Sequence, residues 1–94
     1  SIEVEGVLLR HPSILEVAVV GLPHDTWGEA PHAFAVLRPG TTLTMDELRD
    51  FTHERLARFK VPKGLTIVEE LPKTATGKIQ KYVLRGGRAA IAAQ

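Results

Sequence analysis

Two apolar runs in the first half of the chain have the pattern of β-strands. Residues 14–22 are apolar at most positions, and residues 17–20 are apolar without a break. A strand of this kind has both faces covered, so we expect a central strand that ends at Pro23. A second strand is expected at residues 30–37, with Pro31 near its start. Because the loop between the two runs is short, we expect them to be antiparallel neighbours.

Helical periodicity marks three other stretches. Apolar side chains recur at helical spacing in residues 2–11, and Pro12 stops this first helix. Thr44 is followed by a glutamate three positions later, which is the pattern of a capping box and predicts a helix from residue 45 to about residue 58. A last short helix is expected at residues 79–85, before a pair of glycines.

These elements together predict an α+β fold. A third strand is expected at residues 65–70, after the second helix. The order strand, helix, strand permits a parallel crossover, and such crossovers are right-handed. We therefore expect a small domain with a three-stranded core sheet flanked by about three helices. With 94 residues, the chain has room for one such domain, over residues 1–94.

Composition narrows the range of partners. Lys and Arg number 12 against 11 Asp and Glu, which gives a formal net charge of +1. Since a nucleic-acid-binding domain usually carries a clear excess of positive charge, we expect no nucleic-acid partner. Cysteine is absent, which excludes disulfides and thiolate metal sites and fits a cytoplasmic location. We expect no transmembrane segment, because no apolar run approaches the ~20 residues that span a bilayer. A signal peptide is not expected either.

A loop in the second half of the chain is polar between Pro72 and Ile79, which predicts a surface position. Lys78 falls in the first turn of the expected last helix, where the helix dipole disfavours cations. Thr76 can cap that helix, and Gly77 lets the chain bend close to a partner. Because a lysine beside free backbone N–H groups forms an anion site, we interpret Lys78 as binding a phosphate or carboxylate supplied by another piece of protein. The alternative is a solvated lysine in a polar loop.

A second group of cations surrounds the expected end of the middle helix. Its members are Arg55, Arg58, Lys60 and Lys63, and Phe59 lies among them. One interpretation is structural, because cations stabilise the negative C-terminal end of a helix. The other is a phosphate patch in which Phe59 offers a flat face to a nucleotide base.

The remaining candidate positions are few. Trp27, the single tryptophan, lies beside Gly28 in the loop between the first two strands, where it either covers the core or contacts a ligand. No two histidines stand four residues apart, so we expect no metal site. We also expect no catalytic dyad, because the pattern places no histidine to activate a serine and sets no two carboxylates face to face. The pair Gly77 and Lys78 is not a P-loop, because the upstream glycine and the following Ser or Thr are missing.

Four segments together resemble one enzyme superfamily. Residues 71–81, LPKTATGKIQK, look like the closing motif of the adenylate-forming superfamily, which contains acyl-CoA synthetases, adenylation domains of peptide synthetases and firefly-type luciferases. Three earlier segments match in order: IEVE at residues 2–5, GLPHD with GE within residues 21–29, and FKVPK at residues 59–63. The whole chain is therefore similar to the small C-terminal, or lid, domain of these AMP-binding enzymes, and most like that of acyl-CoA synthetases and fatty-acid–CoA ligases. On this resemblance, the large N-terminal domain and the hinge lie outside the chain.

The resemblance implies a two-step reaction in the complete enzyme. A carboxylate attacks the α-phosphate of ATP to give an acyl-adenylate and pyrophosphate. The small domain then swings, and the thiol of CoA displaces AMP. The implied cofactors are ATP, with Mg²⁺ held by the large domain, and CoA. The implied partners are the protein's own N-terminal AMP-binding domain and a small carboxylic acid, and the small domain alone is expected to be inactive.

The resemblance also assigns roles to single residues. Lys78 matches the lysine that bridges the attacking carboxylate and the ATP phosphate, and it serves the first step only. Thr76 and Gly77 belong to the same cofactor-binding loop. A fixed cation at this point stabilises charge that grows on the phosphoryl oxygens, so this role agrees with the physical chemistry of the step.

For the second step, the resemblance implies a CoA site. Residues matching Trp27, Phe59 and Lys63 line the nucleotide end and the tunnel of CoA, with Phe59 against adenine and Lys63 at a phosphate. Some relatives carry a further basic residue where this chain has Val61, a departure that bears on the CoA contact. Two alternative functions stay open: the matching part of a peptide-synthetase adenylation domain, which loads a carrier protein, and a non-catalytic module that binds phosphate or a partner protein.

Overall fold

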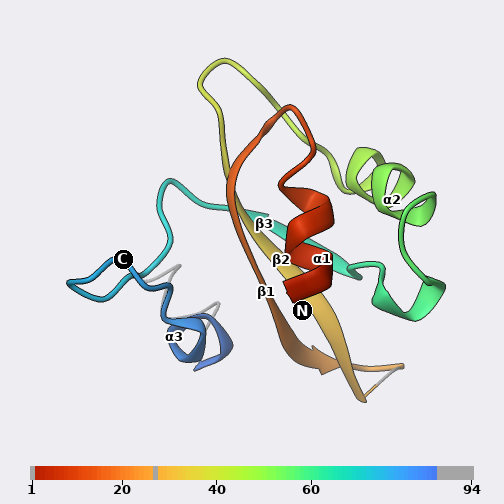
Figure 1. Cartoon of the computed structure of the whole chain (residues 1–94). Coiled ribbons are helices and arrows are strands. Elements are labelled where there is room, and N and C mark those ends of the chain that lie inside the picture. The colour runs from red at the N-terminus through yellow and green to blue at the C-terminus, as the bar shows by residue number, and fades with distance from the viewer. Residues whose placement is uncertain (1, 27, 87–94) are drawn as a thin grey trace.

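The computed structural model of the chain describes residues 2–26 and 28–86 (Figure 1). The helices are α1 (Ile2–Leu8), α2 (Met45–His53), the 3-10 helix η1 (Arg58–Lys60) and α3 (Lys81–Gly86). The strands are β1 (Ile14–His24), β2 (Gly28–Leu37) and β3 (Gly64–Ile67). These elements confirm the predicted α+β domain with a three-stranded sheet. Within the described ranges, no helix is long and apolar enough to cross a membrane.

The middle strand of the sheet is β2, because the strand order is β1-β2-β3. The pairing of β1 with β2 is antiparallel, as predicted, and that of β2 with β3 is parallel, as the strand, helix, strand order permits. The prediction that the first strand is central is wrong, although residues 17–20 are all buried. Helices cover both faces of β1, so this outer strand carries the apolar pattern of a central one.

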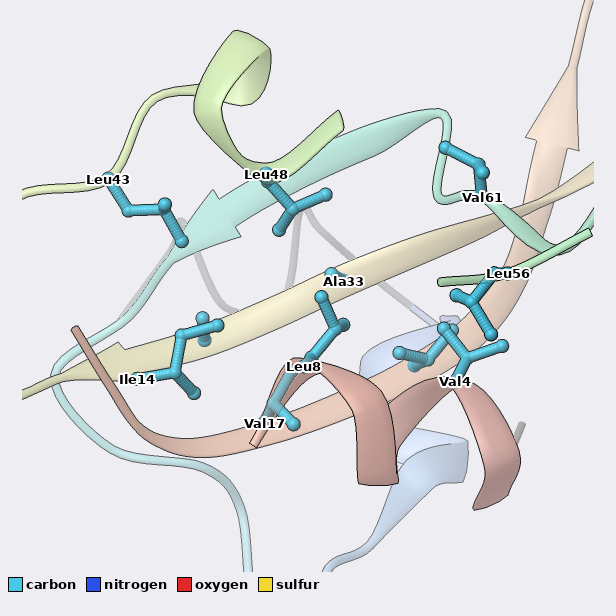
Figure 2. Packing of buried hydrophobic residues seen from close by; sticks show 11 residues of the cluster. Val4, Leu8, Ile14, Val17, Ala33, Leu43, Leu48, Leu56 and Val61 are labelled. Atoms are coloured by element: carbon cyan, nitrogen blue, oxygen red, sulfur yellow. The ribbon is translucent and has the colours of Figure 1, made fainter. Parts of the chain in front are cut away.

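Helices α1 and α2 lie on one face of the sheet, and α3 lies on the other (Figure 1). Val17 and Val19 of β1 belong to the core beneath α1 and α2, which Figure 2 shows. Ala18 and Val20 belong to a second core, together with Leu84 of α3. Because successive side chains of a strand point to opposite faces, β1 contributes to both cores.

A β-bulge near the start of β1 changes this alternation. Ile14 is paired with Leu37 and Glu16 with Val36, so β1 has one extra residue between these pairs. As a result, Ile14 packs in the core beneath α1 and α2. Glu16 is in phase with Ala18 and therefore lies on the α3 face of the sheet.

The second helix is shorter than predicted and ends at His53. In a longer helix, the carbonyl of Phe51 would accept a hydrogen bond from the N–H of Arg55. Here the guanidinium of Arg55 donates to that carbonyl at 2.8 Å, and the N–H of Arg55 donates to the carbonyl of Thr52 at 3.0 Å. The last turn thus tightens to a three-residue spacing, which is a common way to end a helix.

The strand boundaries also differ from the predicted ones. Pro23 was expected to end the first strand, but β1 continues to His24. Since β1 lies at the edge of the sheet, the missing N–H of a proline there leaves the ladder intact. Strand β3 spans Gly64–Ile67 and is shorter than the predicted residues 65–70.

Candidate functional site

The segment that carries Lys78 is held as a small hairpin. Lys73 and Ile79 form an antiparallel bridge at its base. The N–H of Thr74 donates to the carbonyl of Lys78 at 2.8 Å, and the N–H of Gly77 donates to the carbonyl of Thr74 at 2.9 Å. The tip is exposed, as predicted, and the hairpin projects from the sheet on the side of α3 (Figure 1).

Lys78 does not stand at a helix N-terminus, so that prediction is wrong. The helix begins at Lys81, because Ile79 is held in the bridge and keeps an extended backbone. Thr76 does not cap α3; its hydroxyl lies 3.0 Å from that of Thr74. The N–H of Lys78 donates to the side-chain oxygen of Thr74 at 3.1 Å and is not free for an anion. An anion site here therefore depends on the Lys78 ammonium group and not on helix N–H groups.

Gly77 bends the chain at the tip of the hairpin, as predicted. Its φ of +89° lies in a region that residues with a Cβ rarely adopt. A Cβ added at this position would meet nothing within 4 Å. Glycine is therefore required by the backbone conformation of the turn. It is not required by the close approach of any described neighbour.

The Lys78 side chain is exposed and makes no hydrogen bond or ion pair with any residue in the ranges 2–26 and 28–86. Three other lysines form ion pairs: Lys60 with Glu3, Lys73 with Glu16, and Lys81 with Glu5. The ammonium group of Lys78 is thus available to an anion that comes from outside the described part of the chain.

A second candidate site lies where η1 approaches β2. Phe59 is 73% exposed and lines a cavity of about 530 Å³. Lys63 lines the same cavity, and its N–H donates to the carbonyl of Pro31 at 2.8 Å, which fixes this segment against β2. The other lining residues are Glu29, Ala30, Pro31 and Arg58. The structure thus brings Phe59 and Lys63 together at one cavity.

Arg58 extends this site into a second cavity of about 300 Å³, which Lys63 also lines. The remaining lining residues are His24, Arg49, His53, Val61 and Pro62. None of these described lining residues is a carboxylate, so the cavity favours an anion. Two of the predicted cations are used elsewhere: Arg55 lies 4.0 Å from the centre of an aromatic ring of α2, and Lys60 pairs with a carboxylate of α1.

Some lining residues were missed by sequence reasoning. Glu29 and Pro31 of β2 border the cavity of Phe59, although they lie far from it in sequence. Only the packing of η1 against β2 brings these segments together, and no local pattern marks it. Trp27, predicted to contact CoA, lies outside the described residues. Among the residues that the structure does describe, no three His, Asp or Glu side chains gather as a metal site.

The two candidate sites lie at different places on the domain. The base of the Lys78 hairpin is bound to Glu16, near the start of β1. The cavity of Phe59 is lined by Pro31, which pairs with Gly21 further along β1. At ~3.4 Å per residue, the strand from residue 16 to residue 21 spans roughly 17 Å. Figure 1 shows the hairpin on the α3 side and the segment after α2 on the other side. The structure therefore does not bring Lys78 and Phe59 together.

Comparison with known proteins shows the family of this chain. Residues 3–78 match the family model of the AMP-binding enzyme C-terminal domain. The chain belongs to this family. The matched range contains both candidate sites, and Lys78 is its last residue. The resemblance read from the four sequence segments is thereby confirmed.

Relatives of this AMP-binding C-terminal domain are CoA ligases. The 2-methylpropanoate–CoA ligase of Humulus lupulus is 49% identical over 87 residues, which cover 90% of this chain and 16% of that protein. The peroxisomal trans-cinnamate:CoA ligase of Petunia hybrida is 45% identical over 85 residues, with coverages of 90% and 15%. A solved structure of o-succinylbenzoate CoA synthetase from Bacillus subtilis, in complex with an acyl-adenylate intermediate, is 38% identical with a TM-score of 0.83 and coverages of 93% and 18%. The chain thus spans about 16% of the length of the first of these relatives.

Proposed function

We propose that this chain is the mobile C-terminal domain of an ATP-dependent acyl-CoA synthetase. The complete enzyme converts a carboxylic acid, ATP and CoA to acyl-CoA, AMP and pyrophosphate through an acyl-adenylate. The observation that supports this most directly is the exposed Lys78 ammonium, which has no partner in the described part of the chain. The family of the domain and the CoA ligases among its relatives support the class of reaction.

In the first step, Lys78 supplies a cation between two anions. A carboxylate oxygen of the acid attacks the α-phosphorus of ATP, and the bond from that phosphorus to the β-phosphate oxygen breaks, so pyrophosphate leaves. The ammonium of Lys78 offsets the repulsion between carboxylate and phosphate and stabilises the charge that builds on the phosphoryl oxygens. Lysine suits this role because it is a compact charge on a long stem. We assign Mg²⁺, which accompanies ATP, to the large domain.

In the second step, the site around Phe59 holds the nucleotide end of CoA. The exposed ring of Phe59 offers a stacking surface for adenine, and Arg58 and Lys63 supply cations for its phosphates. The CoA sulfur attacks the acyl carbon, and AMP leaves. A cavity of about 530 Å³ beside these cations favours free CoA over a carrier protein, whose pantetheine arm has no adenosine to place there. Trp27 stays a predicted member of this site.

The proposed role of Lys78 is tested by measuring the two half-reactions separately in the full-length enzyme. Lys78→Ala should lower acid-dependent pyrophosphate exchange by about 10²–10³-fold, equivalent to roughly 3–4 kcal/mol. Thioester formation from preformed acyl-adenylate should stay nearly intact, because the second step does not use this cation. Arg10→Ala serves as the control, because it removes an exposed cation that belongs to neither candidate site. Equal loss in both half-reactions for Lys78→Ala would contradict the role.

The acid itself is chosen by the large domain, so a substrate panel is needed. We propose a fatty or other organic acid, and 2-methylpropanoate, trans-cinnamate and a long-chain fatty acid form a first panel. We also propose a cytoplasmic location. The peroxisomal relative from Petunia hybrida marks the alternative, which cell fractionation distinguishes.

A further inference from the structure

Two ion pairs bind the base of the Lys78 hairpin to the rest of the domain. On one side, the Lys73 ammonium lies 2.6 Å from the carboxylate of Glu16 in β1. On the other side, the Lys81 ammonium lies 2.8 Å from the carboxylate of Glu5 in α1. The two lysines stand five residues before and three residues after Lys78, so one pair holds the first strand of the hairpin and the other holds the helix start that follows its second strand.

The carboxylate of Glu5 is itself fixed by the sheet. Its Oε2 atom accepts a hydrogen bond from the backbone N–H of Val19 at 2.8 Å and also contacts the Lys81 ammonium. The side chain of Glu5 is 17% exposed, less than that of any other carboxylate in the described ion pairs. A carboxylate bound to the backbone of β1 gives Lys81 a fixed point, and through Lys81 it fixes the start of α3.

The position of Glu16 depends on the β-bulge. In a regular strand, residues two positions apart, such as Ile14 and Glu16, would lie on the same face, whereas here they pair with the consecutive residues Leu37 and Val36. The bulge lets Ile14 pack beneath α1 and α2 while Glu16 stays on the α3 face, where it meets Lys73. The strand irregularity therefore serves the hairpin as well as the core.

Burial alone leaves the hairpin tip poorly defined. Leu71 and Leu84 are buried in the second core and anchor the two ends of the segment. No side chain between them is fully buried, and Ile79 packs only partly against that core. Partly exposed ion pairs contribute little to folding stability. The ion pairs do fix the direction in which the hairpin projects, because each joins the base of the hairpin to a packed element of the domain.

We propose that the pairs Glu16–Lys73 and Glu5–Lys81 are positioning pairs that set where the Lys78 ammonium stands during adenylation. This inference rests on the proposed function of Lys78. None of the four residues touches the reactants; they act through the base of the hairpin. Since a displacement of about 1 Å at a catalytic group costs on the order of 10²-fold in rate, a loosened base should slow the first step and leave the second step unchanged.

The test uses the full-length enzyme and both half-reactions. Glu16→Gln removes the charge of one pair, and Glu5→Gln removes the charge of the other while keeping an oxygen for the Val19 N–H. Each variant should lower the rate of acid-dependent pyrophosphate exchange about tenfold, mainly in kcat, with thioester formation from preformed acyl-adenylate unchanged. The exchanged pair, Glu16→Lys with Lys73→Glu, should recover most of the lost exchange rate.

A matched control separates position from stability. Glu54→Gln breaks the exposed pair with Arg55 after α2, whose atoms lie 3.7 Å apart and which lines neither cavity, and should leave both half-reactions unchanged. If Glu16→Gln folds poorly, Lys73→Gln breaks the same pair from the hairpin side. Unchanged exchange in the Glu16 and Glu5 variants, or an equal loss in both half-reactions, would overturn the proposal.

The same assays distinguish this inference from the proposed function beneath it. If Lys78→Ala keeps full pyrophosphate exchange, the proposed function fails, and the positioning role fails with it. If Lys78→Ala collapses the exchange while the Glu16 and Glu5 variants keep it, only the positioning role is wrong. Failure of the exchanged pair to recover exchange, with the enzyme folded, also counts against it.

Discussion

Gly77 and Lys78 depend on each other at the scale of single residues. The φ of +89° at Gly77 turns the chain between Thr74 and Lys78, and the N–H of Gly77 closes the turn on the Thr74 carbonyl at 2.9 Å. An added Cβ would lie in open space, so replacing this glycine introduces backbone strain without a steric clash. The consequence of that strain falls on the direction of the neighbouring Lys78 side chain.

Gly77→Ala should therefore change adenylation more than folding. A left-handed backbone costs a residue with a Cβ about 1–2 kcal/mol, which an exposed turn relieves by changing its dihedral angles. We expect acid-dependent pyrophosphate exchange to fall by about tenfold or more, because Lys78 moves with the turn. Thioester formation from preformed acyl-adenylate should be unchanged, and the two assays together check the prediction.

Gly40 provides a matched control for this variant. Its φ is +79°, and an added Cβ there also meets nothing within 4 Å. Gly40→Ala introduces the same kind of strain before α2, away from the hairpin, and should leave both half-reactions unchanged. An equal fall in pyrophosphate exchange for Gly40→Ala and Gly77→Ala would show a general loss of stability and no particular role for Gly77.

At this scale, the sequence identifies the candidate residues better than it predicts the contacts that they make. The motif marks Lys78 and Gly77, and the polar run around them predicts exposure. The bridge between Lys73 and Ile79 depends on two residues that meet across a turn, which local polarity does not encode. For this reason the helix begins two residues later than the sequence predicts, and Thr76 does not have the predicted capping role.

Helix α2 shows how much one local signal determines at the scale of an element. The side-chain oxygen of Thr44 accepts from the N–H of Glu47 at 3.1 Å, and a carboxylate oxygen of Glu47 accepts from the N–H of Thr44 at 3.0 Å. Leu43 and Leu48 flank this capping box and lie in the same core (Figure 2). A capping box involves four consecutive residues, so the sequence predicts the start of α2 correctly.

Thr44→Ala should destabilise α2 by about 0.5–2 kcal/mol, since it removes the acceptor of the Glu47 N–H. The opening equilibrium of the helix should rise roughly 2- to 30-fold, and amide hydrogen exchange of residues 45–53 reports it. Thr42→Ala is the control, because Thr42 is exposed and its side chain makes no hydrogen bond with another described residue. Equal protection of α2 in the parent and in Thr44→Ala would show that core packing alone holds the helix.

The other elements show where such local signals stop. The apolar run at residues 17–20 predicts burial on both faces correctly, yet β1 is an outer strand. Strand order depends on which strand β3 joins, and nothing within β1 carries that information. Likewise, the end of α2 depends on a hydrogen bond from the Arg55 side chain to the Phe51 carbonyl, which apolar periodicity does not predict.

At the scale of the whole molecule, two candidate sites of different chemistry lie on different parts of one domain. The Lys78 hairpin lies on the α3 side (Figure 1). The cavity of Phe59 is lined by residues 29–31 of β2, which pair with the far part of β1. One site offers a single cation, and the other offers an aromatic ring with Arg58 and Lys63. This separation fits a domain that presents one face to the large domain during adenylation and another during thioester formation.

Lys63→Glu tests whether each site serves one half-reaction, because this substitution should affect only the second. Reversing the charge removes a cation from the proposed site of the CoA phosphates, and losing one charge-assisted hydrogen bond costs about 1.5–3 kcal/mol. We expect the KM for CoA to rise roughly tenfold to a hundredfold, with acid-dependent pyrophosphate exchange unchanged. Lys78→Ala should show the opposite pattern, so the two variants together separate the sites.

Arg38→Glu reverses an exposed charge that lines neither cavity and should change neither half-reaction. Measuring all three variants at one ionic strength keeps screening of these exposed charges constant. If Lys63→Glu slows pyrophosphate exchange as much as Lys78→Ala does, the two sites act in the same step, and one fixed orientation of the domain would serve the enzyme. If the KM for CoA is unchanged, the cavity beside Phe59 binds no phosphate of CoA, and acceptance from a carrier protein becomes the better explanation of this domain.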